Sequence, residues 1–293
     1  MERWFILSFT YEQAIIIGFI QGLTELFPIS SLGHAILIPA WIGGSFKQFI
    51  SQENDAYLLI TIAMHLASSI ALFLVFRKRW ITLITGSYHA VKSKNYQSTP
   101  FRVLAYIVIA TIPVGVLGLV LADYFQSIFG KPQYSALFLT VNGLILITAE
   151  RLSRRDLLHE LQDSDAEIDR RVNSKTALAI GFGQSLALFA GISRFGVTMS
   201  AGLLRRLNHS VASDFAFLLS LPVILGASVV KLPELFTTDA RELLGQILVG
   251  SIISFIATYI SVTFLVRWFK TKTLYPFAIY CLAFGIISLV KFV

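Results

Sequence analysis

The chain has 293 residues, of which 55% are hydrophobic and only 14% are charged, and its mean hydropathy is +0.72. Soluble globular domains carry about 25% charged residues, so the composition excludes an ordinary water-soluble fold and predicts a polytopic membrane protein. The single cysteine excludes an intramolecular disulfide framework. We attribute the net charge of +7 to cytoplasmic loops rather than to a nucleic-acid surface, because no basic patch with interleaved aromatic residues lies elsewhere.

Six stretches are apolar enough to cross a bilayer, which takes about 20 residues in a helix. They are 56–76, 103–122, 134–149, 211–230, 243–266 and 274–292. Two further apolar regions, 13–43 and 176–204, are interrupted by residues rich in Pro, Gly and Ser. Unpaired backbone is costly in hydrocarbon, so each region is predicted to be a re-entrant helical hairpin. The expected fold is therefore all-α, with six full spans plus two hairpins, or about ten membrane helices.

The two interrupted regions resemble each other when one is shifted by 163 residues without a gap. The matched pairs include Gly18 and Gly181, Gln21 and Gln184, Ser30 and Ser193, and Gly33 and Gly196. The sequence therefore predicts an internal repeat.

The repeat suggests one integral membrane domain over 1–293. A first repeat of about 12–149 and a second of about 175–292 flank a cytoplasmic loop, 150–174. Three full spans separate the two hairpins, so the second repeat is expected to be inverted. Inverted repeats with broken helices that meet near the midplane occur in many secondary transporters.

Loop charges predict the orientation, because cytoplasmic loops carry an excess of Lys and Arg. Loops 77–102 and 267–273 are basic, and loop 150–175 carries six Lys and Arg together with seven acids; all three are expected in the cytoplasm. Loop 231–242 is acidic on balance and is expected outside. The first hairpin then opens to the outside and the second to the cytoplasm. No cleavable signal peptide is expected.

The first interruption places polar side chains inside an apolar run. Gln21 and Glu25 are four residues apart and share a helix face. A carboxylate here can hold a divalent cation that bridges to phosphate, or can act as an acid or base. Ser30 or Ser31, with His34 one turn into the next helix, supplies a nucleophile and a proton acceptor.

The second interruption has the features of a phosphate site. Ser193 and Arg194 lie in a glycine-flanked turn that leads into a helix, and Thr198 follows one turn later. A helix N-terminus with a guanidinium group favours a phosphate anion. Leu188 stands where the repeat would place a second glutamate, so the site is expected to be asymmetric. The structural alternative is a buried Glu25–Arg194 ion pair that only joins the repeats.

Three other intramembrane polar residues are expected to have structural or supporting roles rather than to bind substrate. They are His65, Asn142 and Asp214.

The two interruptions resemble the motifs of the undecaprenyl-diphosphate phosphatase family, known as bacitracin-resistance proteins. The family's first motif is Glu or Gln, three residues and Glu, followed by Pro-x-Ser-Ser-x-Gly-His, and it stands here at 21–25 and 28–34. The second is Pro-Gly-x-Ser-Arg-Ser-x-x-Thr, and it stands at 190–198. This second motif departs twice, with Ala190 for proline and Phe195 for serine, and the latter is expected to remove a hydroxyl from the phosphate region.

The resemblance implies a membrane hydrolase that removes the terminal phosphate of undecaprenyl diphosphate. This reaction recycles the lipid carrier of cell-wall synthesis and confers bacitracin resistance. The implied location is the plasma (inner) membrane, with several passes and a site that faces the outside. The implied partners are the polyprenyl diphosphate lipid and the bilayer, with no nucleic acid, and a homodimer is left open.

The resemblance also implies roles for eight tip residues. Glu25, Ser31, His34 and Arg194 fall at catalytic positions, while Gln21, Ser30, Ser193 and Thr198 fall at phosphate-binding positions. Glu25 and Gln21 would hold the cofactor, Mg²⁺ or Ca²⁺, although the amide of Gln21 leaves one carboxylate where many relatives have two. Magnesium commonly takes only one or two carboxylates plus phosphate oxygens, so one can suffice.

Two questions stay open at this point, the identity of the attacking group and the function itself. Ser31 attacks with help from His34, or the histidine is itself the nucleophile, or water attacks with the histidine as base. The rival function is a lipid-phosphate or anion transporter, because inverted repeats and a central anion site fit transport equally well. The Ser-Ser-x-Gly-His cluster beside Glu25 favours the hydrolase, since transport needs no nucleophile and base.

Overall fold

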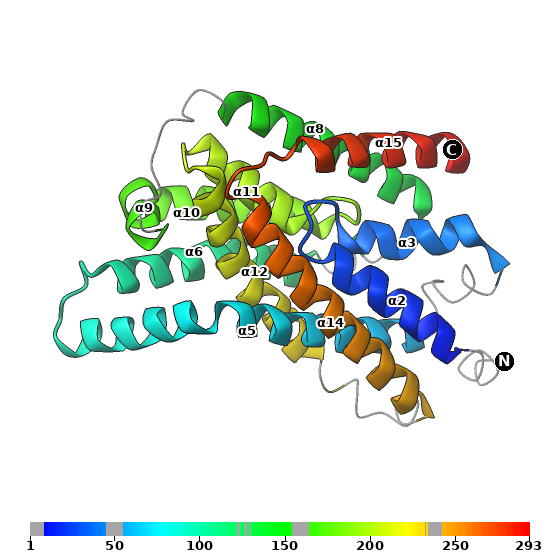
Figure 1. The fold of residues 1–293 in the computed structure, drawn as a ribbon, viewed down its shortest axis with the longest axis horizontal. Helices are drawn as coiled ribbons and strands as arrows, with labels where there is room; N and C mark the ends of the chain where they lie inside the picture. Colours follow the sequence, from blue (N-terminus) through cyan, green and yellow to red (C-terminus); the bar gives the residue numbers. More distant parts are fainter. Residues whose placement is uncertain are drawn as a thin grey trace.

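The structure is a computed structural model that describes residues 9–44, 55–121, 124–125, 128, 130–153, 164–231, 233 and 242–293. Within these residues all regular elements are helices and no strand occurs, which confirms the all-α prediction (Figure 1). The elements are α2 (Tyr11–Thr24), α3 (Ser31–Ile42), α5 (Asp55–Lys92), α6 (Thr99–Val120), α8 (Pro132–Ser153), α9 (Ser164–Arg171), α10 (Ser174–Gln184), the 3-10 turn η2 (Ser185–Leu188), α11 (Arg194–Leu204), α12 (His209–Lys231), α14 (Leu244–Trp268) and α15 (Tyr275–Phe292).

Six of the described helices are long and apolar enough to cross a membrane. They are α5 from Ile60 onward, α6, α8, α12, α14 and α15. Each contains most or all of one of the six spans predicted from the sequence. The protein is therefore a multi-pass membrane protein, as its composition predicted.

Helix α5 is longer than the sequence analysis predicted. The segment 77–102 was expected to be a loop, but the helix continues to Lys92 and the connection to α6 is confined to 93–98. The extension carries apolar side chains at helical spacing, and two of them, Trp80 and Leu83, are buried in the main core. Burial of this apolar face stabilises a helix even where basic residues interrupt the apolar run.

The predicted cytoplasmic loop 150–175 also contains a helix, α9, while residues 154–163 lie outside the described part of the chain. Arg79 of α5 ties α9 to α12: its Nε donates to Asp165 Oδ1 at 2.9 Å and its Nη1 donates to Asp214 Oδ2 at 2.8 Å. Asp214 therefore has the structural role that was expected of it.

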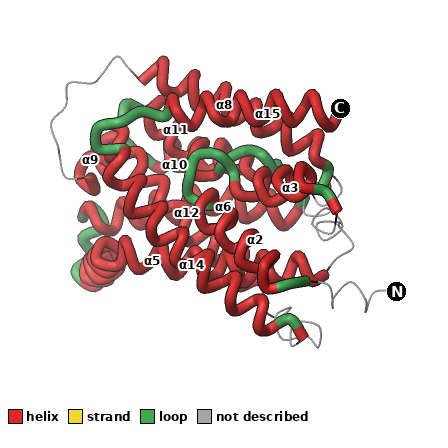
Figure 2. Tube along the Cα trace, turned by 45° about the vertical axis from the view of Figure 1, so that its right-hand side comes forward, coloured by secondary structure: helices red, strands yellow, loops and turns green. Residues whose placement is uncertain are grey.

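Both interruptions predicted from the sequence occur in the structure. Helix α2 ends at Thr24 and α3 begins at Ser31, while η2 ends at Leu188 and α11 begins at Arg194 (Figure 2). The four flanking helices have 14, 12, 11 and 11 residues. At 1.5 Å per residue even the longest spans only about 21 Å, which is less than the roughly 30 Å hydrocarbon core.

Matched glycines let the flanking helices pack closely on distant partners. Helix α2 packs on α14, and α10 packs on α6. A Cβ atom at Gly18 of α2 would lie 2.4 Å from the carbonyl oxygen of Gly250, and one at Gly181 of α10 would lie 2.4 Å from that of Ala110. Small residues at these two positions therefore let the backbones approach, as in many membrane helix pairs.

The close packing at Gly18 predicts that Gly18→Ala destabilises the protein. The added methyl group would push α2 away from α14, and such overpacking costs about 1–3 kcal/mol. We expect a measurable fall in the midpoint of thermal unfolding in detergent. Gly115→Ala on α6 is the control, because nothing lies within 4 Å of the position of its Cβ atom. Equal midpoints for the two variants would contradict the prediction.

Candidate active site

Glu25 lies at the centre of the polar residues in the first interruption. Its backbone N–H donates to Gln21 O, which continues the hydrogen bonding of α2 by one residue. Its Oε2 atom accepts from Gln21 Nε2 at 2.7 Å and from Ser31 Oγ at 2.5 Å. Its Oε1 atom lies 3.8 Å from Arg194 Nη1, and the Glu25 side chain is only 3% exposed. The structure thus brings three predicted site residues, Gln21, Ser31 and Arg194, around the carboxylate of a fourth, Glu25.

The two interruptions are joined through the serines that cap their following helices. Ser30 caps α3, and Ser193 caps α11, each by accepting from the backbone N–H three residues later. Each serine also bonds to the other interruption: Ser30 Oγ accepts from Gly191 N at 3.1 Å, and Ser193 Oγ donates to Phe27 O at 3.1 Å. The N-termini of α3 and α11 are therefore held together at one point.

The backbone at this junction takes unusual conformations. Ser30 has a φ of +70° and Gly191 a φ of +118°, both in the region that favours glycine. A Cβ atom at Gly191 would lie 2.4 Å from Ser135 O, and one at Gly33 would lie 2.9 Å from Gly191 Cα. Strained residues persist only where the surrounding structure holds them, so the junction is a rigid part of the fold.

Asn142 of α8 bridges the two interruptions from one side. Its Nδ2 donates to Pro28 O at 2.9 Å, and its Oδ1 accepts from Ser193 N at 3.0 Å. The side chain is fully buried. Asn142 therefore supports both turns without lining the cavity between them. The sequence feature that pointed to this role of Asn142 is an amide side chain in an otherwise apolar span.

His34 lies on the first turn of α3, as predicted, but its ring nitrogens are hydrogen-bonded to residues other than Ser31. Its Nδ1–H donates to Ser30 O at 2.7 Å, and its Nε2 lies 2.8 Å from the Tyr280 hydroxyl. The ring also stacks on Tyr280 and Phe284. Both ring nitrogens are thus engaged, and the side chain is only 1% exposed. In this arrangement His34 positions the turn before Ser31.

His65 of α5, which the sequence analysis expected to have a structural role, lines the cavity beside Glu25. Its Nδ1 lies 2.9 Å from Gln21 Nε2 and 3.4 Å from Glu25 Oε2. The side chain is 20% exposed and lines the cavity. The sequence feature that could have suggested this position is an imidazole in an apolar span, because an ionisable group there is costly unless it has a function.

A small polar cavity lies between the two interruptions. Its volume of about 20 Å³ is enough for roughly one water molecule. The lining residues are Glu25, Ser30, Ser31, Leu32, His65, Ala187, Ile192, Ser193 and Arg194. Thr198, which was expected to bind phosphate, instead donates to Gln184 Oε1 at 3.4 Å and is fully buried.

Phe195 points away from the cavity, although it stands where the family motif has serine. Its ring is fully buried and packs on Phe217 and Phe269, with ring centroids 4.5 and 5.8 Å away. The sequence analysis expected the change to remove a hydroxyl from the phosphate region. The structure places this position in the apolar core instead.

The donor atoms around Glu25 fit a divalent cation that is shared with a substrate. No group of three or more His, Cys, Asp or Glu that could hold a metal occurs among the described residues. One carboxylate with the Gln21 amide and the Ser31 hydroxyl is too few for a complete protein cage. Magnesium, however, is commonly held by one or two carboxylates together with phosphate oxygens and waters.

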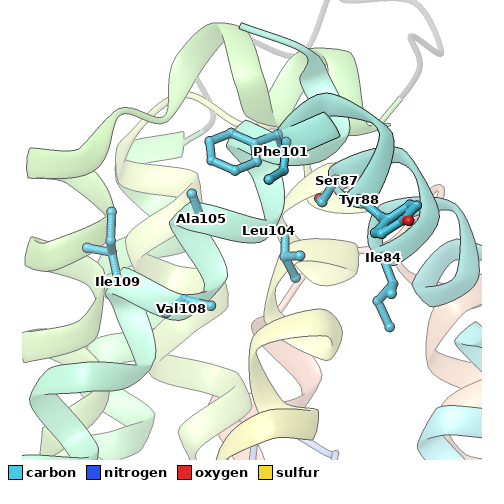
Figure 3. A pocket seen from close by; sticks show the side chains of 9 residues that line it. Ile84, Ser87, Tyr88, Phe101, Leu104, Ala105, Val108 and Ile109 are labelled. Atoms are coloured by element: carbon cyan, nitrogen blue, oxygen red, sulfur yellow. The ribbon is translucent and has the colours of Figure 1, made fainter. Parts of the chain in front are cut away.

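A second hollow lies between α5 and α6, near the connection at 93–98 (Figure 3). Its lining is almost wholly apolar, and Ser87 and Tyr88 are its polar side chains. The other lining residues are Ile84, Val91, Phe101, Leu104, Ala105, Val108 and Ile109. This groove lacks the acid, base and cation that hydrolysis needs, so the chemistry is assigned to the polar cavity.

The bridging contacts predict that Asn142→Asp destabilises the protein, because a carboxylate cannot donate to Pro28 O. Leaving a buried hydrogen-bonding group unpaired costs about 1–3 kcal/mol. Thermal unfolding in detergent would measure the loss. Thr148→Val on the same helix is the control, since Thr148 is exposed and bonds only within its own helix. A variant as stable as the wild type would show that the bridge does not hold the turns.

Comparison with known proteins identifies the family. The family described as "Bacitracin resistance protein BacA" matches this chain over residues 14–287. The undecaprenyl-diphosphatase of Mycolicibacterium paratuberculosis is 41% identical over 96% of this chain and 97% of its own. Undecaprenyl-diphosphatase 2 of Frankia alni is 39% identical over 97% of this chain and 98% of its own. Undecaprenyl-diphosphatase 2 of Chromobacterium violaceum is 35% identical over 94% of this chain and 97% of its own. With its two interrupted regions and nearly full-length matches, the chain belongs to the bacitracin resistance protein BacA family.

Proposed function

We propose that the protein hydrolyses undecaprenyl diphosphate to undecaprenyl phosphate and phosphate. The reaction recycles the lipid carrier for cell-wall synthesis and confers bacitracin resistance. The observation that carries the proposal is the Ser31 hydroxyl, which donates to Glu25 in a cavity that Arg194 also lines. The diphosphatase names of the relatives support the same reaction. A transporter is not favoured, because transport does not require a nucleophile hydrogen-bonded to a base.

The first step transfers the terminal phosphoryl group to the protein. Ser31 Oγ attacks the terminal phosphorus and gives its proton to Glu25 Oε2. The Oγ–P bond forms as the bridging P–O bond breaks, and Glu25 passes the proton to the bridging oxygen, so that undecaprenyl phosphate leaves and Glu25 is again a carboxylate. Water then attacks the phosphoserine and gives a proton to Glu25, which passes it to Ser31 Oγ as the Oγ–P bond breaks and phosphate leaves. Glu25 takes the role of base because it is the carboxylate in hydrogen-bond contact with the nucleophile.

Arg194 and two helix N-termini stabilise the negative charge of the transferred group. Arg194 is the first residue of α11, and its buried Nε has no hydrogen-bond partner in the described structure. It is therefore free to donate to a phosphate oxygen. The N-termini of α3 and α11 meet at the same cavity and favour an anion there. A divalent cation held by Glu25 and Gln21 would add positive charge beside the phosphate oxygens.

His34 is assigned a positioning role in this mechanism. It holds the carbonyl of Ser30, and thereby the turn that presents Ser31. The alternatives in which His34 acts on Ser31 or on water stay predictions. Each requires the ring to leave its contact with Tyr280.

We also propose that both interrupted regions are re-entrant and that the repeats are inverted. The short flanking helices and the exchanged packing of α2 on α14 and α10 on α6 support this arrangement. So does a reciprocal contact between α8 and α15. A Cβ atom at Gly143 would meet Leu282, and one at Gly285, 142 residues later, would meet Thr140. Such reciprocity is what a two-fold axis between equivalent helices produces.

The proposed location is the plasma membrane, with the first hairpin and the cavity open to the outside. The basic end of α5, the 93–98 connection and α9 would then lie in the cytoplasm, as the positive-inside rule requires. A homodimer stays a prediction, since the contacts of one chain do not test it.

The mechanism predicts that Ser31→Ala abolishes phosphate release and Arg194→Ala reduces it at least about 10²-fold, because each removes a group that acts in the transition state. Purified protein in detergent would be assayed with undecaprenyl diphosphate and Mg²⁺. Ser220→Ala is the matched control, since Ser220 bonds only within α12. Rapid quench should trap phosphate on Ser31 of the wild type. An active Ser31→Ala variant would refute the nucleophile, and an inactive but folded wild type would refute the function.

The proposed orientation predicts a difference in cysteine labelling from outside the cell. The buried Cys281 is first replaced by serine. Glu12→Cys, at the exposed start of α2, should react with a membrane-impermeant maleimide in intact cells. Asn95→Cys, in the connection between α5 and α6, should react only after permeabilisation. The reverse pattern would place the cavity on the cytoplasmic side.

A further inference from the structure

His65 lines the cavity, yet the proposed reaction gives it no task. Its Nδ1 faces two side chains of the acidic motif, Gln21 and Glu25. The ring lies on α5, far in sequence from that motif, so only the fold brings them together. The neighbouring span α14 carries no charged residue over 244–266, and Asp214 of α12 is already paired with Arg79. Glu25 and Arg194 are therefore the charged groups that face this region of the cavity.

Three side-chain atoms form a small triangle at this place. The terminal amide nitrogen of Gln21 lies 2.7 Å from Glu25 Oε2 and 2.9 Å from His65 Nδ1. The third edge, from His65 Nδ1 to Glu25 Oε2, is 3.4 Å. The amide donates along both of its edges, so the lone pair of Nδ1 accepts from Gln21 and is directed at the triangle.

The dimensions of this triangle match those of ligands around one divalent cation. Neighbouring ligands of an octahedral ion with bonds of about 2.1 Å are separated by about 3.0 Å. Rotation of the Gln21 amide by 180° about its last bond replaces the nitrogen by an oxygen at the same place. The two hydrogen bonds that the amide donates to Glu25 and His65 would then be lost. The triangle would instead consist of three possible ligand atoms, which are the oxygens of Gln21 and Glu25 and the imidazole nitrogen of His65.

The Glu25 carboxylate divides its two oxygens between different partners. Oε1 faces Arg194 at 3.8 Å, whereas Oε2 faces Gln21, Ser31 and His65. A cation on one lone pair of Oε2 is therefore separated from the guanidinium by the carboxylate itself, and the other lone pair of Oε2 still accepts from Ser31. The partly exposed side of His65 opens to the cavity, which leaves the remaining coordination positions to the substrate diphosphate or to water.

We propose that His65 Nδ1, Glu25 Oε2 and Gln21 Oε1 together bind the divalent cation of the reaction, an inference that rests on the proposed function. His65 takes the place of the second carboxylate that Gln21 does not provide. Calcium takes six to eight oxygen ligands, whereas affinity for first-row transition ions rises with nitrogen ligands. The site should therefore bind Mn²⁺ more tightly than Ca²⁺.

Pulsed electron paramagnetic resonance of Mn²⁺ tests the proposal without any turnover. Untagged full-length protein in detergent is titrated with Mn²⁺, alone and with a non-hydrolysable prenyl methylene-diphosphonate. We expect a ¹⁴N coupling from one imidazole in the wild type and its loss in His65→Gln. The Mn²⁺ dissociation constant should rise at least about tenfold in that variant, with a smaller change for Ca²⁺. His89→Gln is the control, because His89 is exposed at the far end of the same helix.

Four results would overturn the proposal: Mn²⁺ bound without ¹⁴N coupling, coupling that persists in His65→Gln, unchanged Mn²⁺ affinity in that variant, or no Mn²⁺ bound with the analogue present. Thermal unfolding checks that the variant is folded, and His65→Asn replaces it if it is not. Phosphate release is measured separately. In the wild type, bound Mn²⁺ without ¹⁴N coupling but with hydrolysis intact counts against the cation site alone, whereas ¹⁴N coupling without hydrolysis counts against the function alone.

Discussion

The site depends on two serines that each cap one helix and bond to the turn before the other. Ser30 and Ser193 bring the N-termini of α3 and α11 together, and Asn142 bridges the same two turns. A buried hydrogen bond adds only about 1 kcal/mol net, but an unpaired buried group costs about 1–3 kcal/mol, so the set favours a single arrangement. This arrangement is what places Glu25 and Arg194, from opposite halves of the chain, on one cavity.

The two halves contribute different chemistry to this shared junction. Both supply a capping serine and a helix N-terminus, but the acid and the proposed nucleophile come from the first interruption and the arginine from the second. Leu188 stands where a repeated Glu25 would lie. A second acid would repel the phosphate charge that Arg194 balances in the proposed mechanism. The asymmetry thus fits one bound anion, attacked from the side of the first interruption.

Much of the fold and part of the site followed from the sequence, because polar groups in an apolar run must be satisfied or used. The six spans, both interruptions and the grouping of Glu25, Ser31 and Arg194 are of this kind. The length of α5, the direction of His34 and the position of His65 were not predicted. They depend on which way a helix face turns once it packs, and single-helix periodicity does not contain that information. Phe195 shows the same limit, since its motif position suggested the cavity and packing placed it in the core.

The small volume of the cavity has a consequence for substrate discrimination. A space of about 20 Å³ holds a water molecule but not a phosphoryl group, so the side chains that line it must move apart when a substrate enters. The free energy that this opening requires comes from the binding of other parts of the substrate. A long prenyl chain buries apolar surface and supplies that energy, whereas inorganic pyrophosphate has no such part. The small cavity would thereby leave soluble diphosphates unhydrolysed, although they contain the same P–O–P bond.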